Sequence, residues 1–146
     1  MNGSERTMVV VLRVSAVILM TALVPAVMPF AWMETIHRQL GMGELPEGPI
    51  VGYLTRSVSA FYAMHGVLVW FVSLDVRRYR PVIRCLAVLA ALFGSGMIVL
   101  DWAVGMPTWW LLAEGPFLIL IGAILLILAG KVPVRTEPPA GPNPSV

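Results

Sequence analysis

Four long apolar runs constrain what this chain of 146 residues can fold into. They cover about residues 9–31, 50–74, 82–103 and 108–130, and a membrane-spanning helix needs roughly 20 mainly apolar residues. The runs are continuously apolar rather than alternating, which favours helices over a barrel because only these two structures satisfy the backbone in lipid. The sequence therefore predicts an all-α, integral membrane four-helix bundle built from two hairpins.

Prolines and composition support this division of the chain. Pro49, Pro81 and Pro107 each precede one of the runs, and proline suits the first position of a helix. Only 12% of the residues are charged, about half the level of a soluble domain, so the chain cannot cover a water-facing surface. We expect one membrane domain over residues 1–130, with an outer connection at 32–49 and a disordered cytoplasmic tail at 131–146.

The arginines predict the orientation in the membrane. The short connection between the second and third runs reads DVRRYRPVIR, and arginine collects on the cytoplasmic side. Placing this connection inside puts both termini inside and leaves only Arg38 and Arg56, of the ten basic residues, toward the other face. We expect a multi-pass protein of the bacterial inner (plasma) membrane, whose first run is a retained span rather than a cleaved signal peptide.

Two local features of the first half are predicted. Pro25 should kink the first span, since proline removes a backbone hydrogen bond and clashes one turn back. In AWMETIHRQLGMG, the residues Trp32, Met33, Ile36 and Leu40 share one helical face. This pattern is typical of a short helix lying in the membrane interface, with an ordinary outer loop as the alternative.

Three charged residues are expected at membrane depth on the outer side: Arg56, Asp101 and Glu114. Arg56 and Glu114 each lie seven residues after a proline that begins a span, or about 10 Å along the helix. Equal depth predicts an Arg56–Glu114 ion pair, with Asp101 as a second acceptor. Such a pair either fixes the register of the helices or forms part of a site for a ligand or a lipid headgroup.

Tyr62 and His65 form a second intramembrane polar group in the second span. They are three residues apart and so lie on one side of a helix, where a Tyr62–His65 hydrogen bond is the simplest expectation. Haem ligation is the alternative, but the only other histidine is His37, outside the hydrocarbon. We predict no metal site. The single cysteine, Cys85, excludes an intrachain disulfide, and no basic run with aromatics suggests nucleic-acid binding.

Small residues predict where helices meet. The third span carries small residues spaced four apart, such as Ala87 with Ala91 and Ala90 with Gly94, which let helices approach closely in lipid. The second span offers Ala63 and Gly66. We expect these two spans to form a tight hairpin over the arginine-rich connection.

The stretches YLTRSVSAFYAMHG, SLDVRRYRP, DWAVGMPTWW and AEGPFLILIG resemble a set of small bacterial four-span proteins without an assigned activity. The architecture is also loosely similar to the DoxX-like membrane proteins, some of which are linked to quinone-dependent sulfur oxidation. This resemblance implies a four-helix bundle that serves as a subunit or a quinone-associated partner. The long METIHRQLGMGELPEGP connection departs from that group.

Three functions remain open. The favoured one is a small binding or accessory protein, not an enzyme, that holds a lipid or a partner subunit through its outer polar cluster. The second is a redox accessory protein or enzyme that binds quinone at Arg56, Glu114 and Asp101. The third is a small transporter or channel subunit, which is disfavoured because residues 117–128 line no polar path. Beyond the lipid bilayer, neither the partner nor the oligomeric state follows from the sequence.

Overall fold

A computed structural model describes residues 2–133 and places six helices in them. In chain order these are α1 (Gly3–Met20), α2 (Leu23–Val27), α3 (Phe30–Gln39), α4 (Pro49–Val72), α5 (Arg80–Val104) and α6 (Thr108–Lys131). The all-helical prediction is confirmed. Most of the predicted tail, residues 134–146, lies outside the described part of the chain.

The predicted break in the first span is present. α1 ends at Met20, and α2 begins again at Leu23 after a turn at Thr21 and Ala22. Pro25 cannot donate a hydrogen bond to the carbonyl of Thr21, which instead accepts one from the backbone N–H of Val24, 3.0 Å away. The interruption therefore lies one turn before the proline, where its ring and its missing donor act.

The outer connection begins with the short helix α3, so an ordinary loop is the wrong reading of residues 30–39. Met33 is buried, whereas Trp32 and Ile36 remain exposed. A buried methionine beside exposed apolar side chains matches a helix that rests one face on the protein and leaves another for the membrane interface.

Three of the helical stretches are long and apolar enough to cross a membrane: Gly3–Val27, Arg80–Val104 and Thr108–Lys131. Many of their large apolar side chains are exposed, which is the expected distribution for a protein whose solvent is lipid. The helix α4 has the necessary length, at 24 residues, but is less apolar.

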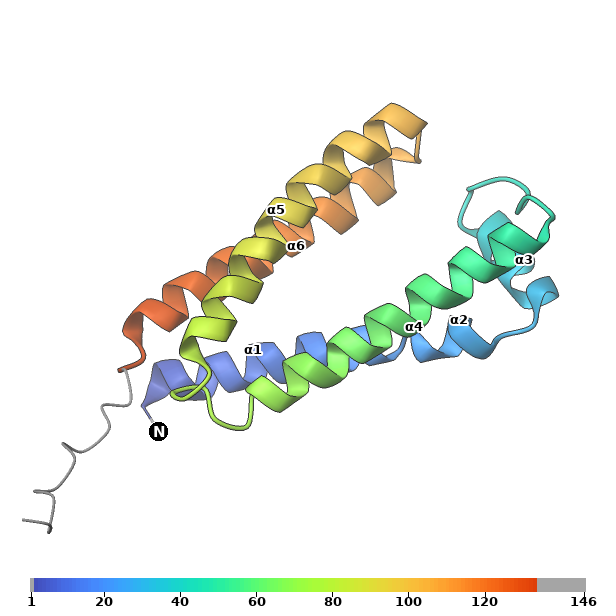
Figure 1. The fold of residues 1–146 in the computed structure, drawn as a ribbon. Coiled ribbons are helices and arrows are strands. Elements are labelled where there is room, and N and C mark those ends of the chain that lie inside the picture. Colours follow the sequence, from blue (N-terminus) through green and yellow to red (C-terminus); the bar gives the residue numbers. More distant parts are fainter. Residues whose placement is uncertain (1, 134–146) are drawn as a thin grey trace, which may run out of the picture.

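The helices pack as two pairs, one formed by α5 and α6 and the other by α4 with α1 and α2. The pairs diverge from a common end and form a V in Figure 1. The predicted tight hairpin of the second and third spans is therefore wrong, because α4 and α5 belong to different pairs. The small residues of α5 contact α6 instead.

Glycines allow the close approach within each pair. A Cβ atom on Gly94 of α5 would lie 2.6 Å from the backbone oxygen of Gly115 in α6, and one on Gly122 would lie 2.6 Å from that of Ala87. In the other pair, a Cβ atom on Gly66 of α4 would lie 2.8 Å from the backbone oxygen of Ala16 in α1. These helices meet backbone to backbone, as small residues permit in lipid.

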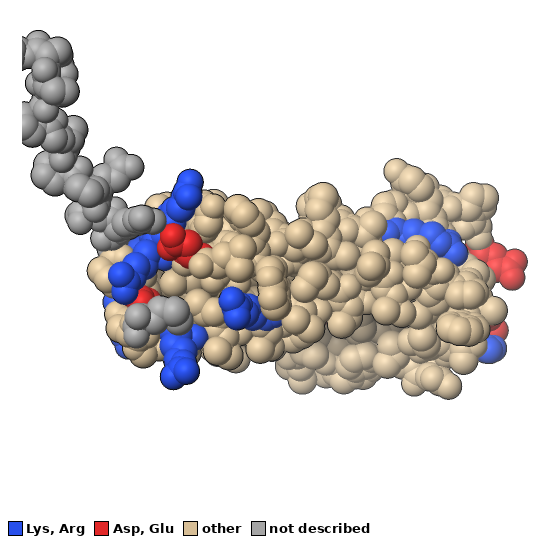
Figure 2. Space-filling model, turned by 90° about the horizontal axis from the view of Figure 1, so that it is seen from below, with Lys and Arg blue, Asp and Glu red and all other residues tan. Residues whose placement is uncertain are grey.

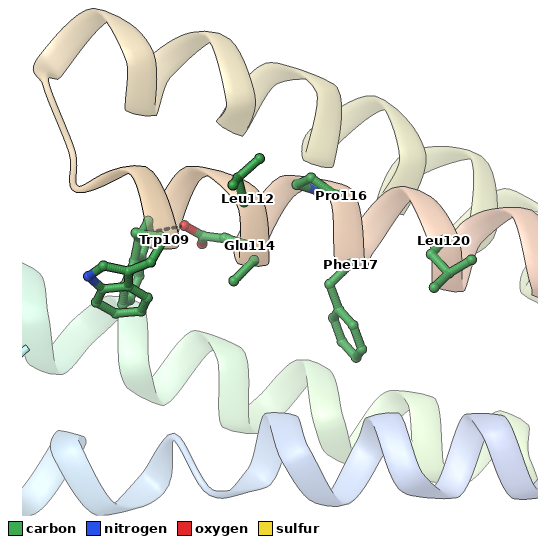
Figure 3. Close-up of a pocket in the computed structure, with 8 residues that line it drawn as sticks. Trp109, Leu112, Glu114, Pro116, Phe117 and Leu120 are labelled. Atoms are coloured by element: carbon green, nitrogen blue, oxygen red, sulfur yellow. Dashed lines mark hydrogen bonds between the residues drawn. The ribbon is translucent and has the colours of Figure 1, made fainter.

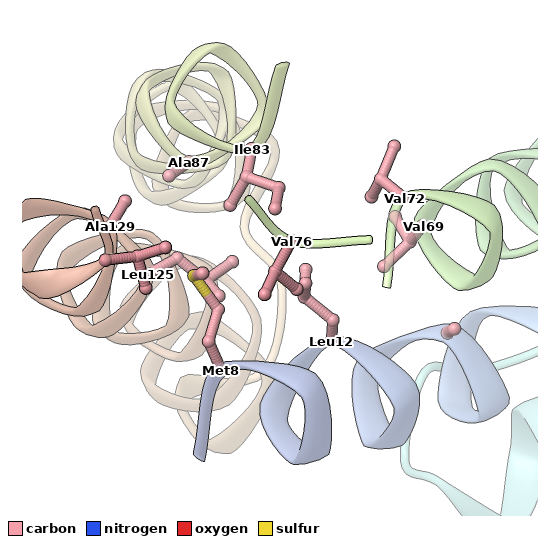
Figure 4. Close-up of a cluster of buried hydrophobic side chains, with 11 residues drawn as sticks. Met8, Leu12, Val69, Val72, Val76, Ile83, Ala87, Leu125 and Ala129 are labelled. Atoms are coloured by element: carbon pink, nitrogen blue, oxygen red, sulfur yellow. The ribbon is translucent and has the colours of Figure 1, made fainter. Parts of the chain in front are cut away.

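The two pairs are joined at the end that carries the N-terminus and the α4–α5 connection. A cluster of buried apolar side chains fills this junction with contributions from both pairs (Figure 4). Met8 and Leu12 come from α1, Val72 from α4, Ile83 from α5 and Leu125 from α6. Packing at one end only leaves the other ends of the pairs separated (Figure 1).

Candidate functional site

A cavity of about 510 Å³ lies between the two helix pairs. Its wall is formed by α1, α4, α5 and α6, and most of its lining is aliphatic or aromatic. The buried residues Leu12, Val69 and Leu125 of the junction form part of its lining. The V-shaped arrangement explains the cavity, because the two pairs are in contact at one end and enclose a space where they begin to diverge.

Four polar side chains line this otherwise apolar cavity: Ser15 of α1, Tyr62 and His65 of α4, and Glu114 of α6. Tyr62 and His65 share a helical face, as their spacing requires. The predicted hydrogen bond between them is absent from the described structure, and both side chains face the cavity instead. Glu114 is close enough to Tyr62 for the two groups to interact electrostatically.

The carboxylate of Glu114 is held by the helix that carries it. The indole Nε1–H of Trp110, one turn earlier in α6, donates a hydrogen bond to Oε2 of Glu114 over 2.5 Å. Trp110 in turn contacts Trp109 edge-on, with ring centroids 5.3 Å apart. This hydrogen bond fixes one carboxylate oxygen and leaves the other available.

Glu114 also borders a second, shallower pocket of about 740 Å³ on α6 (Figure 3). Trp109, Leu112, Pro116 and Phe117 contribute to its lining. Figure 3 shows the Phe117 ring pointing from α6 toward α4, where it also lines the cavity between the pairs. The turn at Glu114 therefore separates a surface pocket from the interior cavity.

The predicted Arg56–Glu114 ion pair is not formed in the structure. Arg56 is exposed, and its guanidinium donates to the backbone oxygens of Met28 at 3.2 Å and Gly52 at 3.4 Å. Met28 ends α2, and the last carbonyls of a helix have no partner within it. Arg56 thus caps the end of α2, whereas His65, also on α4, faces the cavity.

Asp101 is the third member of the predicted cluster. It is only 3% exposed near the end of α5, and one of its carboxylate oxygens, Oδ2, is buried without a hydrogen-bond partner. It does not line the cavity, but its charge acts on Glu114 from the neighbouring helix. Of the predicted cluster, the structure brings Asp101 and Glu114 into electrostatic reach and places Arg56 elsewhere.

A second polar cluster, at the joined end of the helix pairs, was not predicted. Glu5 of α1 is fully buried. Arg77 of the α4–α5 connection donates two hydrogen bonds to its carboxylate, from Nε to Oε1 over 2.8 Å and from Nη2 to Oε2 over 3.0 Å. The hydrogen bond and the charge of Glu5 raise the pKa of Arg77 above its ordinary value. Glu5 also forms a capping box with Asn2, and the N-x-x-E spacing at a helix start is the sequence signal that could have revealed it.

Two more arginines join elements at this end. Arg80 donates from Nε to the backbone oxygen of Ala129 over 2.6 Å and so ties the start of α5 to the end of α6. Arg13 lies over the ring of Trp70, 5.4 Å from its centroid, and links α1 to α4. These two arginines therefore reinforce each pair near the joined end, and Figure 2 shows most of the basic residues gathered at that end of the molecule.

Metal chemistry finds no support in the described residues, which contain no group of three or more His, Cys, Asp or Glu side chains placed to hold an ion. Comparisons with protein-family models, curated proteins and solved structures find no match to this chain. The chemistry of the cavity therefore rests on its own residues.

Proposed function

We propose that this protein is a small binding or accessory protein of the membrane, which holds one hydrophobic molecule in the cavity between its helix pairs. The observation that carries the proposal is the cavity itself: about 510 Å³, mostly apolar walls from four helices, and a few polar groups that converge from α4 and α6. Ligand sites in proteins have this size and this composition.

We further propose that all four long stretches cross the membrane, with both termini in the cytoplasm. If α1–α2 crosses, the chain leaves at the open end of the V, while α5 begins at the joined end (Figure 1). The helix α4 covers that return distance beside α1 and α2. The arginines at the joined end support a cytoplasmic location for that end.

The proposed location is the bacterial inner membrane, and the proposed kinship is with the DoxX-like proteins. Under this proposal the protein works beside another membrane component, such as a partner subunit that receives or supplies the bound molecule. No catalytic set of side chains favours an enzyme over a binding protein.

A quinone is a second candidate ligand, favoured by Tyr62 and His65. Both side chains face the cavity and share no hydrogen bond with each other in the described structure, so both can bond to the oxygens of a quinone ring. The apolar remainder of the cavity suits an isoprenoid tail.

Native mass spectrometry of protein extracted gently from its own membrane tests the proposal. Ala90→Phe places a phenyl ring in the cavity, because Ala90 of α5 is part of its lining. Ala103→Phe is the matched control on the same helix, at an exposed position outside the lining. We expect a bound small molecule on the wild type and on the control, and its loss from Ala90→Phe.

Two results would contradict the proposal. One is a wild-type spectrum of bare protein, which leaves the cavity without an occupant that survives extraction. The other is an adduct that Ala90→Phe retains at the wild-type level, which places the bound molecule elsewhere.

A further inference from the structure

We infer that the molecule held between the helix pairs is a lipophilic organic cation: a compound with delocalised or shielded positive charge on a largely apolar, aromatic body. This inference rests on the proposed function and names the class of ligand that the same cavity would select. It is carried by the one carboxylate and the several aromatic rings that residues 2–133 contribute to the lining, and by the absence of a basic partner for that carboxylate within those residues.

Among the described residues, Glu114 is the only Asp, Glu, Lys or Arg side chain in the lining of this cavity. Its carboxylate accepts a hydrogen bond from the neutral indole of Trp110, and no Lys or Arg of the described chain pairs with it. Arg56, the partner predicted from the sequence, donates instead to the backbone oxygens of Met28 and Gly52. An acidic side chain within a span normally pairs with a cation or faces a pathway, and here a ligand is the available cation.

The charges around Glu114 strengthen this selection. Asp101 of α5 adds a second carboxylate within electrostatic reach. The titratable groups facing Glu114 from α4 are Tyr62 and His65, and α1 contributes only the hydroxyl of Ser15. An anionic ligand would meet this carboxylate without a fixed positive charge to balance it, so a phospholipid phosphate is the wrong chemistry for the cavity.

Aromatic side chains provide the second feature of the cavity that favours an organic cation. Phe61 and Tyr62 of α4, Phe93 of α5 and Phe117 of α6 all line the cavity. The faces of aromatic rings carry partial negative charge and attract organic cations, most strongly where water is excluded. A carboxylate among such rings binds a bulky cation through charge and through apolar contact at once.

The test compares two ions of matched size and shape but opposite charge, tetraphenylphosphonium and tetraphenylborate. Binding to detergent-solubilised full-length protein is measured by titration calorimetry, with tryptophan fluorescence as a second signal because Trp110 bonds to Glu114. The variants are Glu114→Gln, which removes the charge, and Glu114→Asp, which keeps it. Glu47→Gln is the matched control, since Glu47 is exposed on the outer connection.

We expect tetraphenylphosphonium to bind the wild type and Glu47→Gln equally, and tetraphenylborate to bind neither. Loss of the carboxylate should weaken tetraphenylphosphonium binding about tenfold or more, since removing one partner of a buried charge pair typically costs at least this much. Glu114→Asp should retain most of the affinity, which separates loss of charge from loss of folding. Ala90→Phe should weaken binding because it fills the same space.

The inference is overturned if tetraphenylborate binds as well as tetraphenylphosphonium, if Glu114→Gln binds the cation like the wild type, or if no cation binds. Under any of these outcomes, the proposed function still holds if the native mass spectra show a bound molecule that Ala90→Phe removes. Its ligand would then be neutral, as a quinone is. If neither probe binds and the native spectra are bare, both proposals fail together.

Discussion

Adding a single methyl group at the contact between α5 and α6 tests the packing on which the cavity depends. In Gly94→Ala, the new Cβ atom would lie 2.6 Å from the backbone oxygen of Gly115 and 2.9 Å from Cβ of Leu118. Gly96→Ala is the matched control two residues along the same helix, where no atom lies within 4 Å of the added carbon. Both substitutions gain the same helix propensity, so their difference reports the contact alone.

The magnitude follows from these distances. Carbon and oxygen atoms do not approach to 2.6 Å, and the neighbour here is backbone, which cannot rotate away as a long side chain can. The helices must therefore separate by roughly 0.5–1 Å, and a gap of that size forfeits a quarter to a half of each dispersion contact along the interface. Overpacking of this kind costs about 1–3 kcal/mol.

Unfolding of the purified variants in mixed micelles, followed by circular dichroism with increasing SDS, measures the effect. We expect Gly94→Ala to unfold at lower SDS fraction than the wild type, and Gly96→Ala to match or exceed it. The pair Gly122→Ala and Gly130→Ala repeats the comparison on α6, since only Gly122 faces α5. Equal stability of Gly94→Ala and Gly96→Ala would refute the backbone-to-backbone contact of α5 with α6.

Two further predictions concern the joined end and the orientation. Glu5→Gln and Arg77→Gln should each lower the midpoint of unfolding. The double variant should lose less stability than the sum of the two single losses, because the two side chains form one bidentate pair. Additive losses would show that the side chains do not interact. The orientation is tested with single cysteines in a Cys85→Ser background and a thiol reagent that does not cross the membrane. The reagent should label Gln39→Cys in intact cells but Pro133→Cys only after permeabilisation. The opposite pattern would reverse the proposed topology.

Local signals in the sequence were sufficient for three of the four predicted spans, whereas the first, predicted at about 9–31, is divided among α1, α2 and the start of α3. The predicted spans at 50–74, 82–103 and 108–130 fall within about two residues of the ends of α4, α5 and α6. The break before Pro25 and the short helix after Pro29 were also predicted correctly. Each of these features depends on residues within a turn or two of each other, where proline geometry and apolar periodicity act directly.

The pairing of helices did not follow from such signals. Small residues at four-residue spacing show that a helix can approach a neighbour, but not which neighbour it approaches. The Ala87 and Gly94 face of α5 meets Gly115 and Gly122 of α6, where glycine stands opposite glycine or alanine. The same face of α5 against α4 was equally consistent with the sequence, because α4 also carries small residues.

Depth was also an incomplete guide to the polar site. Arg56 and Glu114 lie at similar depth along their helices, but an ion pair requires that the two side chains face each other as well. The end of α2 exposes a carbonyl at Met28, and this local acceptor takes the guanidinium instead.

The position of the cavity follows from the different side chains that lie within the helix pairs, between them and at their joined end. Glycines draw the helices together within each pair, whereas Phe93 and Phe117 stand between the pairs, where bulky rings oppose closure. The buried apolar cluster and the ion pair of Glu5 with Arg77 hold the pairs together at one end only. No Lys or Arg of the described residues pairs with Glu114 in the space between the pairs, and that space is where the proposed cationic ligand would bind.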